Sequence, residues 1–151
     1  MLELIFIIVI IGVLSAIAIP KFALNRDDAI VSKAKSTLSA VRSSIATERQ
    51  KRILRGKFTP ITQLSEKEGD SVSLFNAFDG NTSLPVLEYS PISCKSSGYD
   101  GCWEILQLGS NSDEAEYAFN LPTVGTAIKF KLQKNKFNCI SDDKLCSKLT
   151  Q

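Results

Sequence analysis

The chain offers few of the side chains on which enzymes rely for acid, base or nucleophilic chemistry. Its 151 residues include no histidine, which is the commonest general base, the usual activator of serine and cysteine nucleophiles, and the commonest metal ligand. The cysteines Cys94, Cys102, Cys139 and Cys146 lack the tight C-x-x-C spacing that is typical of structural zinc sites. We therefore expect a protein that is not an enzyme and that holds neither a metal nor a cofactor.

The same cysteines suit disulfide chemistry. An even number of cysteines outside an apolar N-terminal segment indicates an exported domain, because disulfides persist in oxidising compartments and not in the cytosol. Four cysteines allow three connectivities. We predict the sequential pairs, Cys94 with Cys102 and Cys139 with Cys146, because both loops are short and close with little loss of entropy.

Two acidic clusters carry oxygen atoms of the kind that calcium prefers. One contains Asp113, Glu114 and Glu116, and the other contains Asp142 and Asp143. Neither cluster has the dense spacing of acidic residues that marks a calcium-binding loop. We favour solvated turns at both places.

A basic run at 49–57 could contact DNA or could complete the end of a helix. Arg49, Lys51, Arg52 and Arg55 suit the negative pole of a helix dipole, and Gly56 is a natural terminator. The run has no interleaved aromatic residues to stack on bases, and the net charge of the chain is only +2. The helix-end interpretation is favoured, and DNA as a partner is not indicated.

Asn81 lies in the sequence Asp79-Gly80-Asn81-Thr82-Ser83, in which Asn-Thr-Ser is an acceptor for N-glycosylation. The acid two residues before the asparagine resembles the extended acceptor sequence of bacterial oligosaccharyltransferases. Asp-Gly-Asn also favours a simple turn. Both interpretations can hold together, because an exposed turn is what a glycosylating enzyme requires.

The N-terminal segment MLELIFIIVIIGVLSAIAIP places one acid, Glu3, ahead of an uncharged apolar run that ends at Pro20. As a helix, residues 4–19 would span about 24 Å, and flanking residues would extend this toward the roughly 30 Å core of a bilayer. We predict that residues 1–20 form a transmembrane and polymerisation segment. A cleaved signal peptide would begin with basic residues, and a plain anchor has no use for an acid at its start.

This segment resembles the N-terminus of the type IV pilins and of the pseudopilins of type II secretion and DNA-uptake systems. Met1-Leu2-Glu3-Leu4 matches the family from its third mature position, Gly12 matches the helix-softening glycine, and Pro20 matches the kink proline. The resemblance implies that Glu3 pairs with the α-amino group of a neighbouring subunit during assembly. The residues themselves predict that 12–19 unwinds when a filament forms, because Pro20 lacks an N–H and because Gly12 and Ser15 weaken the helix before it.

The elements that position these residues follow from periodicity. A helix is expected from Leu2 to Leu54, and its outer half, 21–56, carries an apolar stripe at spacings of three and four. Residues 57–151 form the head, with a connecting region at 57–91, a short helix possible around 71–78, and strands at 86–89, 103–108, 116–120, 126–133 and 136–140. The expected fold is α+β, with a long N-terminal helix packed on an antiparallel sheet of three or four strands.

The sequence thus favours a structural subunit that waits in the inner membrane and polymerises with copies of itself into an extracellular type IV pilus, aided by pilus or secretion assembly machinery. One alternative is a pseudopilin of a type II secretion or competence system, which would form a periplasmic filament. The other is a bitopic membrane protein whose periplasmic domain binds a partner without polymerising. Adhesion, motility, DNA uptake and secretion remain open at this level.

Overall fold

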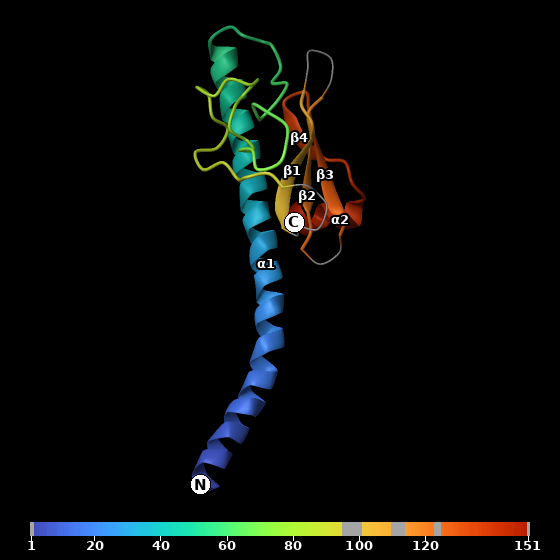
Figure 1. Ribbon diagram of the computed structural model, residues 1–151. Helices are drawn as coiled ribbons and strands as arrows, with labels where there is room; N and C mark the ends of the chain where they lie inside the picture. The colour runs from blue at the N-terminus through green and yellow to red at the C-terminus, as the bar shows by residue number, and fades with distance from the viewer. Residues whose placement is uncertain (1, 95–100, 110–113, 123–124, 151) are drawn as a thin grey trace.

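The protein consists of an N-terminal helical stem and a head that packs on the outer half of the stem (Figure 1). The computed structural model describes residues 2–94, 101–109, 114–122 and 125–150, and it describes the side chains of helix α1 except at 2 and 16–25. The α+β class is confirmed, because α1 packs against a four-stranded antiparallel sheet. The elements are α1 (Leu2–Leu54), β1 (Cys102–Gln107), β2 (Glu116–Asn120), β3 (Ala127–Gln133), β4 (Lys136–Cys139) and α2 (Asp143–Thr150).

Helix α1 has 53 residues, and those of its described side chains that join the core of the head lie in its outer half. Ala34, Leu38, Val41 and Ile45 form the predicted stripe and are almost fully buried. The helix ends in a Schellman motif, in which the Lys57 amide donates to the Arg52 carbonyl at 2.8 Å and the Gly56 amide donates to the Ile53 carbonyl at 2.9 Å. Gly56 has a φ of +71°, which a residue without Cβ adopts at no steric cost.

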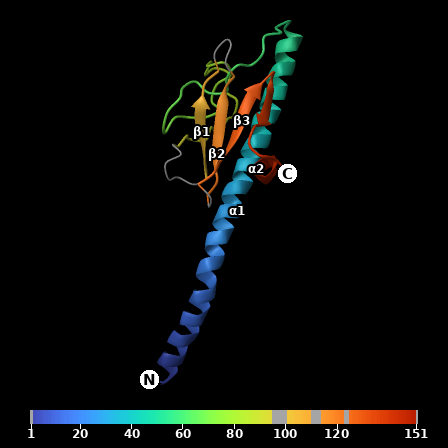
Figure 2. The ribbon, with the colours of Figure 1, turned by 90° about the vertical axis from the view of Figure 1, so that its right-hand side faces the viewer.

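The sheet has the order β1-β2-β3-β4, and every pair is antiparallel. One face carries the apolar residues of the strands toward α1, and β4 lies closest to the helix, where Arg42 Nε donates to the Phe137 carbonyl at 3.1 Å (Figure 2). Lys134 and Asn135 both have positive φ and connect β3 to β4 through a tight turn. The inward residues of the sheet are Trp103, Ile105, Tyr117, Phe119, Ile128, Phe130, Leu132 and Phe137.

The connection from 57 to 94 contains neither the helix nor the strand that the sequence suggested. Ser71 and Phe75 have positive φ, which interrupts a right-handed helix, so the predicted helix at 71–78 is wrong. The predicted strand at 86–89 is also wrong, because these residues do not join a sheet. The Leu87 amide donates instead to the carbonyl of Phe75, which lies in the same connection. This segment is held instead by isolated bridges, turns and side-chain hydrogen bonds.

The C-terminal helix α2 was not predicted. Its first amides are satisfied by the Asp142 carbonyl, which accepts from both Leu145 and Cys146 at 2.9 Å. Leu149 is buried, and Leu145 packs against the core one turn earlier. Helix α2 therefore packs beside α1 and covers part of the core there (Figure 2).

Candidate assembly surface

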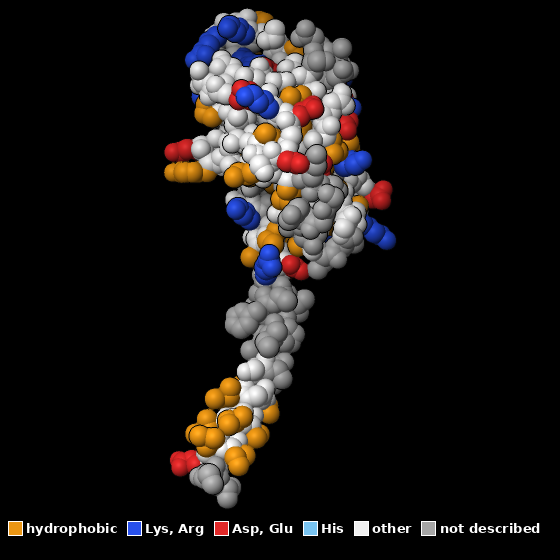
Figure 3. Space-filling model, viewed as in Figure 1, with side chains coloured by type: hydrophobic (Ala, Val, Ile, Leu, Met, Phe, Trp, Pro, Cys, Tyr) orange, Lys and Arg blue, Asp and Glu red, His pale blue; other side chains and the backbone are white. Residues whose placement is uncertain are grey.

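The inner half of α1 presents apolar side chains that pack against no described residue of the head. Ten large hydrophobic residues between Leu4 and Leu14 are each 43–66% exposed. Figure 3 shows the corresponding hydrophobic atoms gathered on the lower stem, apart from the head. Monomeric soluble proteins rarely expose a contiguous apolar surface of this kind, and such a surface marks a site of interaction. We call residues 3–14 the apolar stem.

Glu3 is the only charged residue of the apolar stem. Its side chain is exposed, and within the described part of the chain it has no hydrogen bond or ion pair. It lies in the first turn of α1, where a carboxylate interacts favourably with the helix dipole. A carboxylate beside Leu4 and Ile7 would be costly to cover with apolar groups unless a cation came with them.

The structure places Gly12 and Pro20 within an uninterrupted helix. A Cβ added at Gly12 would meet nothing within 4 Å, so packing inside this chain does not require a glycine there. Backbone helix continues through position 20, while the side chain of Pro20 lies outside the described side chains. The unwinding of 12–19 that the sequence predicts concerns an assembled form and stays a prediction.

Across the residues that the structure describes, no helix has a stretch that is both long and apolar enough to cross a membrane.

Two arginines of the basic run at the end of α1 make contacts inside the head. Arg52 Nε lies 3.0 Å from Glu48 Oε1, and its guanidinium also lies 2.7 Å from Asp79 Oδ2 in the connecting region. Arg49 donates to the carbonyls of Phe58 and Thr59 at 3.2 and 3.3 Å. Two of the five arginines and lysines in the 49–57 run, Arg49 and Arg52, therefore anchor the connection that follows α1.

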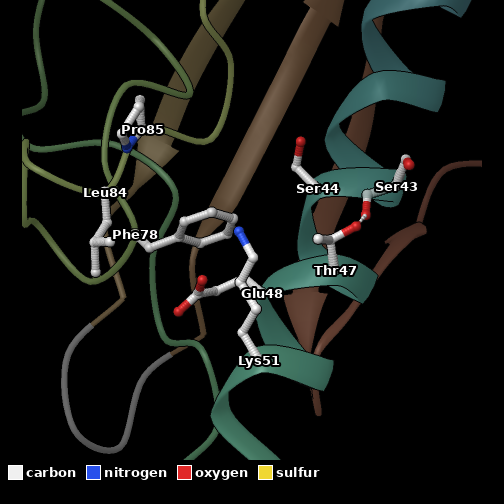
Figure 4. A pocket seen from close by; sticks show the side chains of 8 residues that line it. All are labelled: Ser43, Ser44, Thr47, Glu48, Lys51, Phe78, Leu84 and Pro85. Atoms are coloured by element: carbon white, nitrogen blue, oxygen red, sulfur yellow. Dashed lines mark hydrogen bonds between the residues drawn. The ribbon is translucent and has the colours of Figure 1, made fainter. Parts of the chain in front are cut away.

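A shallow groove of about 330 Å³ lies beside these contacts, between the 43–51 face of α1 and the loop at 78–85 (Figure 4). Hydroxyl groups of α1 line one wall, and Phe78, Leu84 and Pro85 line the other. Glu48, the groove's carboxylate, is already bonded to Arg52, and the Thr47 hydroxyl donates to the Ser43 carbonyl at 2.9 Å. Two polar side chains of this groove, Thr47 and Glu48, are thus committed to contacts within the fold.

In the first of the two acidic clusters, the described carboxylates pair with a lysine. Lys131 Nζ lies 2.9 Å from Glu114 and 3.4 Å from Glu116, and its hydrogen bond lowers the pKa of the Glu114 carboxyl. Asp142 caps α2 through its carbonyl, whereas Asp113 lies outside the described residues. Among the residues described, no group of three or more acidic or sulfur ligands could hold a metal ion.

Both disulfides join the residues that the sequence pairs. Cys94–Cys102 connects the end of the 57–94 segment to the start of β1, and Cys139–Cys146 connects the end of β4 to α2. None of the cysteines in the described part of the chain is free. Asn81 lies on an exposed turn of the connecting region.

The interactions that sequence analysis missed are those between distant segments. The contact of Arg52 with Asp79 has no local signal, because the two residues belong to different elements and no spacing rule links them. The Leu145 and Leu149 pair, four residues apart after two aspartates, could have indicated α2.

No family model matches the chain, and searches of curated proteins and of solved structures gave no match.

Proposed function

We propose that this protein is a structural subunit that polymerises through its N-terminal helix into a filament of the type IV pilus kind. The observation that carries the proposal is the division of α1 into two halves. The head covers the outer half, and no described residue outside α1 covers the apolar stem. Copies of the same stem supply a matching apolar surface, as in a helical homopolymer.

Relative to exposure in water, the free energy gained by covering the stem is comparable with the cost of immobilising a subunit in a filament. Complete burial of one large aliphatic side chain contributes about 1.5–3 kcal/mol, and about half of each side chain is exposed here. Burial of all ten therefore contributes on the order of 10 kcal/mol per subunit, comparable with the cost of about 4–15 kcal/mol for immobilising it. Each subunit has several neighbours in a helical bundle, which adds contacts without repeating that cost.

Glu3 gives the proposed assembly its register. Apolar contacts alone would tolerate several axial offsets between parallel stems, because they are not directional. A carboxylate covered without a cation costs several kcal/mol, so an offset that pairs Glu3 with an α-amino group of a neighbour is favoured over the others. The acid thus selects one arrangement among many that the apolar residues allow.

The test compares variants of the stem and of the head in the native host. Glu3→Ala should abolish filaments while the amount of subunit stays at the wild-type level, because no described residue of the head contacts Glu3. Glu88→Ala is the matched control, since Glu88 is an exposed acid on the head. Filaments are scored by electron microscopy and subunit amount by immunoblot.

A second variant tests the apolar contribution separately. Val9→Asp introduces a charge in the middle of the apolar stem and should also abolish filaments. Normal filament yield from both Glu3→Ala and Val9→Asp would contradict the proposal. Loss of filaments in Glu88→Ala would show that removing an acid from the head also prevents assembly, so that the effect is not specific to the stem.

A further inference from the structure

The Asp79–Ser83 sequence is a motif that filament assembly does not explain. No other asparagine in the chain is followed two positions later by serine or threonine. The two disulfides indicate that the head folds in an oxidising compartment, which is also where N-glycosylating enzymes meet exported chains. We propose that Asn81 carries an N-linked glycan and that the glycan is attached before the head folds around Asp79.

The acceptor asparagine is presented at the surface. Asn81 follows a tight turn in which its amide donates to the Phe78 carbonyl at 3.0 Å, with Asp79 and Gly80 at φ of +52° and +74°. Its Oδ1 accepts from the Ser83 amide at 3.0 Å. Within the part of the chain that the structure describes, its Nδ2 atom has no hydrogen-bond partner. The nitrogen that must react is thus available on an exposed side chain.

The acid of the motif, in contrast, is occupied in the folded head. Asp79 Oδ1 accepts from both the amide and the hydroxyl of Thr62, at 2.7 and 2.9 Å. Asp79 Oδ2 lies 2.7 Å from the Arg52 guanidinium on α1. A transferase that reads this carboxylate through its own cation must compete with three charge-assisted contacts. Competition is absent while the chain is unfolded, and this fixes the order of events.

The bond changes are those of amide glycosylation. Nδ2 of Asn81 forms a bond to the anomeric carbon of an oligosaccharide that is carried on a polyisoprenyl pyrophosphate. The bond from that carbon to the pyrophosphate oxygen breaks, and its electron pair leaves with the pyrophosphate. Nδ2 loses one proton to a base of the transferase. After transfer, folding places the Asp79 carboxylate against Arg52 and Thr62, and the glycan stays outside the turn.

The presence of the glycan is tested on protein from the native source. After reduction and alkylation, trypsin releases residues 68–95 as one peptide, because no lysine or arginine lies between Lys67 and Lys95. We expect this peptide to carry an added saccharide mass that fragmentation localises to Asn81. Detection of the peptide at its unmodified mass alone would overturn the proposal. Filament assembly does not enter this measurement, so its result is independent of the proposed function.

The order of events is tested in vitro with the full chain, a purified bacterial oligosaccharyltransferase and a lipid-pyrophosphate-linked oligosaccharide. The reduced and alkylated chain should be modified at least tenfold faster than the folded, disulfide-bonded chain. Equal rates would overturn the proposed order. In the unfolded chain, Asp79→Asn should also slow transfer at least tenfold. Because Arg52 does not contact Asp79 in that chain, the loss measures how the transferase recognises the carboxylate.

Two substitutions next to the acceptor serve as matched controls in the unfolded chain. Ser83→Ala removes the hydroxyl residue that the acceptor sequence requires and should abolish transfer. Thr82→Ala changes the position that the acceptor sequence leaves free and should retain it. Transfer to Asn81→Gln or to Ser83→Ala at the wild-type rate would contradict the assignment of Asn81.

Discussion

Removing the buried hydroxyl of Tyr117 should change the free energy of unfolding by an amount that depends on pH. Tyr117 is fully buried among aromatic residues, and its ring centroid lies 5.2 Å from that of Phe75. Its oxygen accepts the Leu64 amide at 2.9 Å and so satisfies a buried donor of the connecting region. Burial raises the pKa of Tyr117 to about 12, because the phenolate would lose its hydration.

Tyr117→Phe should lower the free energy of unfolding by about 1–3 kcal/mol at pH 8, because the Leu64 amide loses its partner in a dry site. Above the ordinary pKa of 10.0, the unfolded chain releases the Tyr117 proton while the folded chain keeps it up to about pH 12. The wild type therefore loses about 1.4 kcal/mol of stability per pH unit in this window, and the Phe variant lacks this loss. The difference between the two proteins should shrink by about 1–2 kcal/mol between pH 8 and pH 11.

Urea unfolding in nonionic detergent measures this difference. The emission maximum of Trp103, the single tryptophan, reports opening of the core, because its side chain is buried beside Phe119. Tyr89→Phe is the control, since Tyr89 is 87% exposed and should behave as the wild type at both pH values. A difference between the wild type and Tyr117→Phe that is the same at pH 8 and at pH 11 would refute the reasoning.

Three further substitutions test the contacts that hold the head on α1. Leu38→Ala should cost about 2–5 kcal/mol in the same urea assay, because it leaves a cavity in the buried stripe. Replacing Cys139 and Cys146 together by alanine should cost about 2–4 kcal/mol and expose the C-terminal lysines to trypsin, which peptide mapping detects. Arg52→Gln should cost about 3 kcal/mol, since Glu48 is then buried without its cation, and Glu48→Gln in the same chain should restore part of the loss.

The parts of the fold that were predictable from sequence are those set by local rules. The bounds of α1 follow from its apolar period and from Gly56, which supplies the left-handed residue of the helix end. The four strands of the sheet follow from branched and aromatic residues between turn formers, and the β3–β4 turn at Lys134 and Asn135 was visible as such.

The connecting region could not be predicted because side chains far apart in the sequence determine it. The Ser65 hydroxyl accepts the Phe75 amide at 3.0 Å, and the Asn135 side chain accepts the Ile61 amide at 2.8 Å. These bonds replace regular secondary structure at 57–94, and no local periodicity records them. The same reason explains why the Arg52–Asp79 contact, which determines how the glycosylation motif is presented, had no sequence signal.

The sequence alone predicted that the apolar stem is covered by something other than water. It did not predict what covers it. Apolar residues with no polar period predict an environment other than water, and the structure adds that the head leaves this stretch uncovered. The contacts within the described part of the chain do not say which surface covers it, because the side chains of residues 3–14 are exposed there.

The most direct test of the proposed assembly is a cryo-electron microscopy reconstruction of filaments sheared from cells, with mass spectrometry to identify the subunit. We expect this chain in the filament, with the side chains of residues 4–14 buried in the core and Glu3 within ion-pair distance of a neighbouring α-amino group. We also expect non-helical backbone just before Pro20. A map in which the stems of this subunit lie on the outside, or sheared filaments that contain none of this chain, would contradict the account.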